Sequence, residues 1–215
     1  MKKKVVIIDY GLGNIVSAQQ SFIKDAKENN LNVDVVITNE VETINNSTHI
    51  VLPGQGAFKS CIEGLRSIDG MIDSLENNVL NKKKPFLGIC VGMQMMANNS
   101  EEGKLDGLGW IDANVKKFNL DKVDIQKFPL PHMGWNKVTN LTENELLKNL
   151  NNESRFYFLH SYYFDEKSSN DAIAQSAYIE KFTSIVKKNN IYGVQFHPEK
   201  SHENGIQLLK NFSDL

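Results

Sequence analysis

The chain has 215 residues, of which 40% are hydrophobic and 23% are charged, and its formal net charge is −2. This composition is typical of a globular protein, and a charge so near zero gives no electrostatic basis for binding nucleic acid or an anionic membrane surface. No apolar run approaches the ~18 residues of a membrane-spanning helix, and the stretch Val5–Ile8 is too short for the core of a signal peptide.

The cysteine and arginine contents narrow the functional classes further. Cys61 and Cys90 are too few for a disulfide framework or a zinc site, so we expect a reducing, cytoplasmic compartment. Arginine occurs at Arg66 and Arg155, and the remaining basic residues are lysines. Because arginine clusters are the usual clamp for phosphate groups, their absence argues against a phosphorylated substrate being turned over in this chain.

The first half of the chain alternates short apolar strands with helical segments. We predict strands at Val5–Asp9, Val33–Thr38, His49–Leu52 and Pro85–Leu87, and helices at Ile15–Lys27, Ala57–Leu65, Met71–Leu80 and Met93–Ala97. Asn14 is expected to cap the first helix. This alternation predicts a parallel sheet with helices on both faces.

In the second half, strands are separated by polar turns rather than by helices. We predict strands at Trp110–Phe118, Trp135–Thr139, Phe156–Phe164 and Ala172–Tyr178, a hairpin of Ser184–Lys187 with Ile191–Phe196, a surface excursion at Asn140–Glu153 and a last helix at Glu203–Phe212. No linker divides the halves. The predicted fold class is therefore α/β: residues 1–215 form a single domain whose open, mostly parallel sheet is flanked by helices and extended by antiparallel strands.

The segment that carries most chemical information is Gly88-Ile89-Cys90-Val91-Gly92, which joins a strand to a helix. It has the pattern of a nucleophile elbow with cysteine as the nucleophile, and its glycines suit a strained turn against which another chain segment packs. A thiol at the start of a helix is favoured as thiolate by the helix dipole. A buried core cysteine is the alternative, because free cysteine is among the most buried residue types. Cys61 lies in a helical pattern with no base or oxyanion loop expected nearby, so it is predicted to be dispensable.

Two further glycine segments follow predicted strands. Tyr10–Asn14 contains a G-x-G that lacks the third small residue of a dinucleotide loop, so we interpret it as a tight turn. Leu52–Phe58 contains Pro53-Gly54-Gln55-Gly56 at the carboxyl end of a parallel strand, where open α/β sheets bind ligands. An acyl-transfer cysteine needs two oxyanion donors, for which we propose the N–H of Val91 and one from the loop of Gly54, Gln55 and Gly56.

A cysteine nucleophile also needs a base and a group that orients it. Of the five histidines, His49 and His202 are expected to be structural and solvent-facing respectively, and His132 and His160 could be core residues. His197 differs because Pro198 favours an extended backbone, in which His197 and Glu199 point to the same side. Cys90, His197 and Glu199 therefore form a candidate catalytic triad.

These three segments, P-G-x-G, G-x-C-x-G and H-P-E, together resemble the class-I, triad-type glutamine amidotransferases over nearly the whole chain. The segments Pro131–Asn136, Leu159–Tyr163 and Gln195–Ser201 are similar in particular to the glutaminase-subunit family of imidazole glycerol phosphate synthase. That resemblance implies a flavodoxin-like fold, hydrolysis of L-glutamine without metal or cofactor, and a heterodimer. The ammonia would pass to a (β/α)8-barrel cyclase subunit that makes imidazole glycerol phosphate and AICAR in histidine biosynthesis.

The resemblance also implies roles for single residues. Glutamine would be held by Gln94, by the Gly54 loop and by the backbone around Ser161 and Tyr162. Positions on the partner-facing surface would be Asn14, Trp135 and Lys200. Gln55 departs from the family, in which valine is common; because this position offers its backbone N–H, we expect altered loop reorientation rather than altered chemistry.

Three alternatives remain open from the sequence. A paralogous glutaminase that supplies ammonia to a sugar amidotransferase would carry the same triad. A non-catalytic regulatory domain could keep the fold, although the complete triad argues against it. A cysteine hydrolase of the same general fold would lack the combined P-G-x-G and H-P-E segments.

Overall fold

Parallel strands form the half of the sheet that the first part of the chain supplies. The computed structural model describes residues 2–29, 31–121, 123–166 and 170–215. The strands lie in the order β2 (Val33–Thr38), β1 (Lys3–Ile8), β3 (His49–Gly54), β4 (Phe86–Cys90) and β13 (Ile191–Val194), and each neighbouring pair is parallel. Central β3 and β4 are buried along their whole length, as expected where helices cover both faces.

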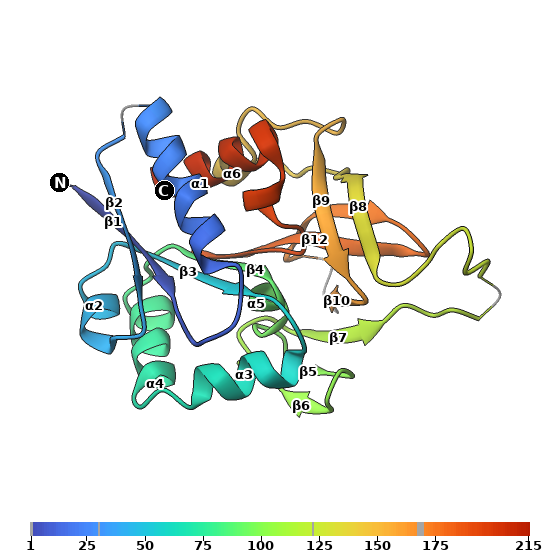
Figure 1. Ribbon diagram of the computed structural model, residues 1–215, viewed down its shortest axis with the longest axis horizontal. Coiled ribbons are helices and arrows are strands. Elements are labelled where there is room, and N and C mark those ends of the chain that lie inside the picture. The colour runs from blue at the N-terminus through green and yellow to red at the C-terminus, as the bar shows by residue number, and fades with distance from the viewer. Residues whose placement is uncertain (1, 30, 122, 167–169) are drawn as a thin grey trace.

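Helices cover both faces of this half (Figure 1). Helices α1 (Ile15–Glu28) and α6 (His202–Asp214) pack together on one face, and α2 (Val41–Asn45), α3 (Phe58–Arg66) and α4 (Met71–Leu75) lie on the other. The helical segment predicted over Met71–Leu80 is confirmed, although its second part departs from α geometry, because α4 continues as a π-helical segment at Glu76–Asn81. Asn14 stands at the N-cap position of α1 as predicted, but its side chain makes no capping hydrogen bond.

Mostly antiparallel strands extend the sheet beyond β13. The order continues through β12 (Lys181–Lys188), β10 (Tyr162–Glu166), β7 (Ala113–Lys117), β5 (Asn99–Ser100) and β6 (Leu105–Asp106), and β11 (Ala172–Ala177) pairs with β12. The predicted hairpin is confirmed as β12–β13, with Asn189 at φ 57° supplying the left-handed turn residue that glycine often provides. The expected mostly parallel α/β sheet with an antiparallel extension is thus confirmed.

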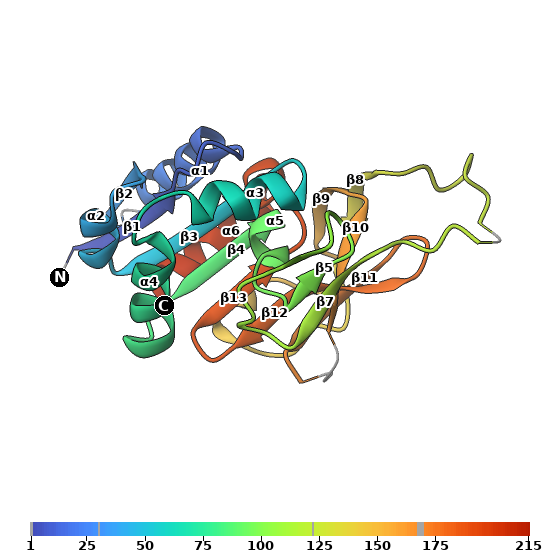
Figure 2. The same cartoon turned by 90° about the horizontal axis from the view of Figure 1, so that it is seen from below.

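A second sheet is the main departure from the predicted architecture. Phe156–Phe164 is not one strand: β9 (Arg155–His160) ends at His160 and β10 begins at Tyr162, with Ser161 between them. Strand β9 pairs with β8 (His132–Lys137) in a separate antiparallel pair, whereas β10 joins the large sheet. The described residues between β7 and β8, 119–121 and 123–130, project from the body of the protein (Figure 2).

The segment Asn140–Glu153 was predicted as a surface excursion, and this holds only in part. A 3₁₀ turn at Glu145–Leu147 buries Leu146 completely and Leu147 nearly so. Asn211 of α6 donates to the carbonyls of Leu146 and Lys148, which fixes this turn on the helix. In the described part of the chain, no helix is long and apolar enough to cross a membrane.

Candidate active site

Cys90 lies at the last position of β4, at the strand-to-helix turn that the sequence predicts. Its backbone has φ 55° and ψ −111°, a combination that L-residues rarely adopt, and α5 (Val91–Gln94) begins at the next residue. Strained backbone of this kind persists where the surroundings impose it and is concentrated at functional sites. The geometry is that of a nucleophile elbow, which leaves the buried side chain at the carboxyl edge of the sheet.

Glycines let the oxyanion-loop candidate approach this elbow. A Cβ on Gly92 would lie 1.8 Å from the Leu52 carbonyl oxygen, and one on Gly54 would lie 2.6 Å from the Gly92 nitrogen. No side chain fits in either place. Gly54 is also the residue paired with Cys90 in the β3–β4 register. The loop at Gly54–Gly56 therefore lies beside the start of α5, as its proposed role requires.

The expected help from a helix dipole is weak in this fold. Helix α5 has four residues, and the chain continues in turns in which Met96 and Ala97 donate to Met93 and Gln94. A single turn aligns few peptide dipoles, so it cannot be the principal stabilisation of a thiolate. The groups that meet the sulfur must supply more of it.

His197 and Glu199 form the short hydrogen bond predicted from the sequence. His197 Nδ1 lies 2.8 Å from Glu199 Oε1, and both side chains are at most 3% exposed. His197 Nε2 makes no hydrogen bond of ordinary geometry and is free to exchange a proton. A carboxylate on Nδ1 fixes the tautomer in which Nε2 carries the lone pair, the arrangement needed in a general base.

The protonation of His197 is shifted by its neighbours. Burial by itself lowers its pKa, but the negative charges of Cys90 and Glu199 outweigh burial and raise the pKa to about 10. A pKa raised this far favours the imidazolium form of His197 near neutral pH, in which it can give a proton to a leaving group.

The H-P-E segment reaches this geometry through a turn and not through an extended strand. His197 is extended, but Pro198–Lys200 form a 3₁₀ turn, which corrects the reasoning that placed His197 and Glu199 on one side of a strand. Ser201, which the sequence did not single out, donates to the His197 carbonyl at 2.6 Å and accepts from the Tyr157 N–H at 2.9 Å. It ties the turn to β9.

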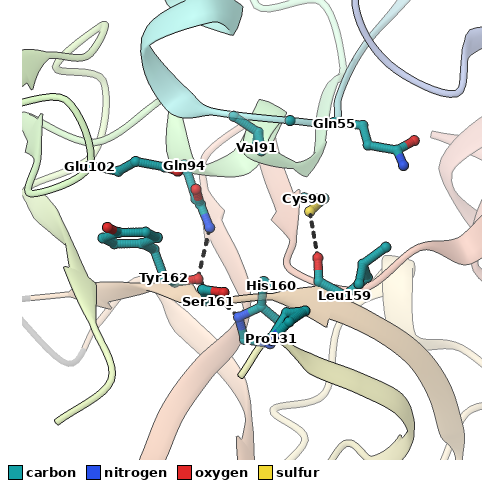
Figure 3. Close-up of a pocket in the computed structure, with 11 residues that line it drawn as sticks. Gln55, Cys90, Val91, Gln94, Glu102, Pro131, Leu159, His160, Ser161 and Tyr162 are labelled. Atoms are coloured by element: carbon teal, nitrogen blue, oxygen red, sulfur yellow. Dashed lines mark hydrogen bonds between the residues drawn. The ribbon is translucent and has the colours of Figure 1, made fainter. Parts of the chain in front are cut away.

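Cys90 opens on a cavity of about 310 Å³ (Figure 3). The structure gathers there many of the predicted residues, together with others that the sequence did not indicate; the lining consists of Gln55, Gly56, Cys90, Val91, Gln94, Glu102, Pro131, Leu159, His160, Ser161 and Tyr162. Gly54, His197 and Glu199 are not part of this lining. The cavity is of a size for an amino acid, and its walls come from both sheets.

A chain of amide hydrogen bonds runs from the cavity wall to Gln195, which lies behind it. Gln94 Nε2 donates to the Tyr162 carbonyl at 2.9 Å and to Gln195 Oε1 at 3.1 Å. Gln195 Nε2 donates to Cys90 Sγ at 3.7 Å. The Cys90 thiol points to the Leu159 carbonyl, at 3.8 Å (Figure 3). Gln195 lies within the segment that carried the resemblance, but no sequence argument assigned it a role.

Comparison with known proteins agrees with this geometry. The glutamine amidotransferase class-I family matches residues 6–214. The chain belongs to the class-I glutamine amidotransferase family. It is 46% identical to imidazole glycerol phosphate synthase subunit HisH 2 of Methanococcus maripaludis, with 97% of this chain and 98% of that protein covered. Subunit HisH of Leptospira interrogans is also 46% identical, over the same shares of the two chains.

Solved structures support the fold of this amidotransferase independently of close sequence similarity. A putative GMP synthase protein of Thermoplasma acidophilum superposes with a TM-score of 0.69 at 20% identity, covering 100% of this chain and 94% of that one. A glutamine amidotransferase of Thermotoga maritima gives a TM-score of 0.62 at 18% identity, with 93% and 77% covered.

The second cysteine of the amidotransferase is closer to the site than the sequence suggested. Cys61, on α3, is completely buried, and its thiol donates to the Gln55 carbonyl at 3.6 Å. Tyr10 supports the same loop by donating to the Pro53 carbonyl at 2.7 Å. The expectation that no oxyanion loop lies near Cys61 was therefore wrong. Its role is nonetheless structural, because burial raises the pKa of its thiol and disfavours the thiolate that a nucleophile needs.

The remaining histidines are structural in different ways. His132 and His160 are buried and hydrogen-bonded to each other at 2.9 Å, and burial lowers their pKa values to about 4 and about 3. His49 is buried at the start of β3, as expected. His202, expected to face solvent, is exposed but stacks on Trp135 with ring centroids 5.0 Å apart.

The three residues expected at a partner surface lie on elements around the active site. Asn14 precedes α1, next to Gly13, which approaches Pro53 and Gly54 of the candidate oxyanion loop. Trp135 is 40% exposed on β8, and Lys200 in the H-P-E turn places its ammonium 5.9 Å from the Tyr157 ring.

Proposed function

We propose that this chain is the glutaminase subunit of an imidazole glycerol phosphate synthase, and that residues 1–215 act as one glutamine amidotransferase domain. The observation that carries the proposal is the buried His197–Glu199 pair beside Cys90, whose elbow opens on a cavity sized for an amino acid. The relatives from Methanococcus maripaludis and Leptospira interrogans, which bear that name and match almost end to end, support the assignment.

In the proposed reaction, the Cys90 thiolate attacks the side-chain amide carbon of L-glutamine. The N–H groups of Val91 and of the loop at Gly54, Gln55 and Gly56 stabilise the oxyanion. His197 gives its proton to the departing nitrogen, and ammonia leaves. His197 then takes a proton from a water molecule, which attacks the γ-glutamyl thioester and releases glutamate and the free thiolate. Glu199 orients the imidazole throughout, and the steps require no metal or cofactor.

We propose that glutamine is held by Gln94, by the Gly54 loop, and by the backbone around Ser161 and Tyr162. The Tyr162 carbonyl already accepts from Gln94 and from His160 Nδ1, each at 2.9 Å. Two acceptor lone pairs are thereby used, so this carbonyl is not a substrate ligand. Both N–H groups of Gln94 are also used, which leaves its carbonyl oxygen to accept from the substrate.

We further propose that ammonia passes to a (β/α)8-barrel cyclase subunit, with which this chain forms a cytoplasmic heterodimer in histidine biosynthesis. Asn14, Trp135 and Lys200 are the candidate interface residues. The exposure of Trp135 (40%) and Met133 (65%) on the same strand supports this face, because large exposed apolar side chains that cluster mark contact surfaces. We infer that the Gly54–Gly56 loop rests with its donor turned from the oxyanion until the partner and its ligand bind.

The test uses this chain with the cyclase subunit of the same organism. Cyclase and its nucleotide ligand should raise glutamine hydrolysis by about 10²-fold or more, the worth of one oxyanion donor. A complex with Cys90→Ala should form no cyclase product with glutamine, but it should form that product with ammonium salt at high pH, where free ammonia can enter. Cys61→Ala is the matched control and should keep glutamine-dependent activity. Full glutaminase activity of the chain alone, or no ammonia rescue, would refute the proposal and favour a glutaminase for a different acceptor, such as a sugar amidotransferase.

A further inference from the structure

Gln195 is a buried amide with no solvent contact, directly after the end of β13. Its backbone N–H donates to the Ser184 carbonyl at 2.9 Å, and its side chain is 0% exposed. A buried amide costs free energy unless its donors and acceptor are paired, so its two contacts define its orientation. Those contacts are Gln94 on one side and the Cys90 sulfur on the other.

The direction of the hydrogen bonds follows from the carbonyl at the far end of the chain of amides. The Tyr162 carbonyl can only accept, so the group of Gln94 that faces it at 2.9 Å must be the NH₂ group. The second N–H of that group then meets Gln195 at 3.1 Å, where it requires the carbonyl oxygen of Gln195. The NH₂ group of Gln195 consequently points to Cys90 Sγ. Flipping this amide would place the NH₂ groups of Gln195 and Gln94 opposite each other, with no acceptor between them.

A donor aimed at the sulfur acts differently on the two states of Cys90. In the thiol form the S–H group is directed to the Leu159 carbonyl, and the Gln195 contact, at 3.7 Å, is weak. In the thiolate form the sulfur becomes a charged acceptor, and hydrogen bonds to charged groups are the stronger ones. The short helix α5 offers little such stabilisation, as argued above.

We propose that Gln195 is a positioning residue of the glutaminase site: its amide stabilises and orients the Cys90 thiolate while it holds Gln94 toward the substrate. This rests on the proposed role of Cys90 as the nucleophile. Gln195 transfers no proton and lies outside the lining of the cavity. Its effect is to join the nucleophile and the substrate-binding amide into one rigid unit.

The test is the pH dependence of Cys90 alkylation by iodoacetamide in the chain without a partner, located by peptide mass spectrometry. Gln195→Met has nearly the same length and no donor. It should move the alkylation midpoint upward by about one pH unit and slow alkylation about tenfold at pH values well below the midpoint of the unsubstituted protein, since the lost bond is to a charged acceptor. Asn211→Leu is the matched control: it removes a buried amide whose donors bond to the carbonyls of Leu146 and Lys148, so it should lower stability without moving the midpoint.

The other titratable groups near the sulfur stay the same in this comparison; they are His197 with Glu199, Tyr10 and Cys61 under the loop, and His160 and Glu102 on the cavity wall. A measurement on the unsubstituted protein does not depend on whether the variant folds. The side-chain ¹⁵N–¹H signals of Gln195 should titrate with the Cys90 midpoint and should lose that transition in Cys90→Ser.

The outcomes separate this inference from the proposed function. If parent Cys90 is alkylated readily and Gln195→Met leaves the midpoint unchanged, or if the Gln195 amide does not titrate, the inference on Gln195 is wrong and the nucleophile assignment stands. If parent Cys90 shows no thiolate-dependent alkylation at all, both are wrong.

Discussion

Replacing Glu199 by glutamine keeps the shape of the side chain and removes its negative charge. Glu199 Oε1 lies 2.8 Å from His197 Nδ1, and Glu199 Oε2 has no hydrogen-bond partner, so the carboxylate is committed to the imidazole. The replacement amide can still accept from Nδ1–H through its oxygen, which keeps the tautomer. What the variant loses is the charge that favours imidazolium.

The size of this effect follows from the hydrogen bond and its burial. A hydrogen bond to a charged group contributes about 1.5–3 kcal/mol, which corresponds to about 10–100-fold in rate or about one to two pH units. The pKa of His197 is raised above its ordinary value, so the imidazolium persists up to about pH 10. Its contribution to the stability of the fold is complete below about pH 6.5 and is lost as the pH rises from there to about 10. In Glu199→Gln the alkaline limit should move down by about one to two pH units.

The assay is glutamate release in the complex with the cyclase subunit, measured across pH. Glu199→Gln should lower kcat about 10–100-fold with little change in KM, because Glu199 does not line the cavity. His197→Ala removes the proton-transfer group itself and should cost about 10³-fold or more. Equal losses in the two variants, with folding intact by circular dichroism, or an unmoved alkaline limit in Glu199→Gln, would refute the orienting role.

Two further predictions concern buried groups. Cys90→Ser should lower glutamine-dependent glutamate release by at least about 10³-fold. Cys61→Ser should lower it less than about tenfold, because this substitution alters only a weak hydrogen bond to the Gln55 carbonyl. Comparable losses in the two variants would contradict the assignment of Cys90 as the nucleophile. Burial raises the pKa of Asp25, on α1, from its ordinary 3.8 to about 6, so its charged form destabilises the fold as pH rises through that interval. Asp25→Asn should therefore raise the free energy of unfolding in urea by on the order of 1–2 kcal/mol at about pH 8 and by little at about pH 4. An equal gain at the two pH values would show that the charge of Asp25 does not cause the destabilisation.

The sequence carried enough information for the parallel half and for the local geometry of the three candidate triad residues. Buried parallel strands such as β3 and β4 are continuous apolar runs, and the elbow and the H-P-E turn depend on residues adjacent in the chain. Local patterns of this kind are visible without tertiary structure. The break at Ser161 was not visible, because the apolar residues on either side of it are buried against different sheets and read as one strand.

Contacts between distant segments were also beyond local patterns. Gln195 reaches Gln94 from 101 positions away in the chain. Cys61 is a different case, because its contact with the Gln55 carbonyl is only six positions away, across the start of α3. The single turn of α5 was missed for a similar reason: residues Met93–Ala97 favour a helix, but the chain must turn to let Leu108, Gly109, Trp110 and Ile111 donate to carbonyls of Met95, Met96 and Ala97. Tertiary hydrogen bonds override local propensity there.

The break at Ser161 and the contacts of Gln195, which the sequence did not reveal, lie close together where the two sheets meet, and this explains how the site is constructed. Ser161 separates a strand of the small sheet from a strand of the large one, and the Tyr162 carbonyl immediately after it anchors Gln94 and His160. Cys90 and Gln195 approach the same point from β4 and β13. Cys90 therefore belongs to the large sheet, whereas one wall of its cavity belongs to the strand pair that carries Trp135. Because that pair has two strands, the wall that it supplies is held by fewer ladder hydrogen bonds than the elbow in the large sheet.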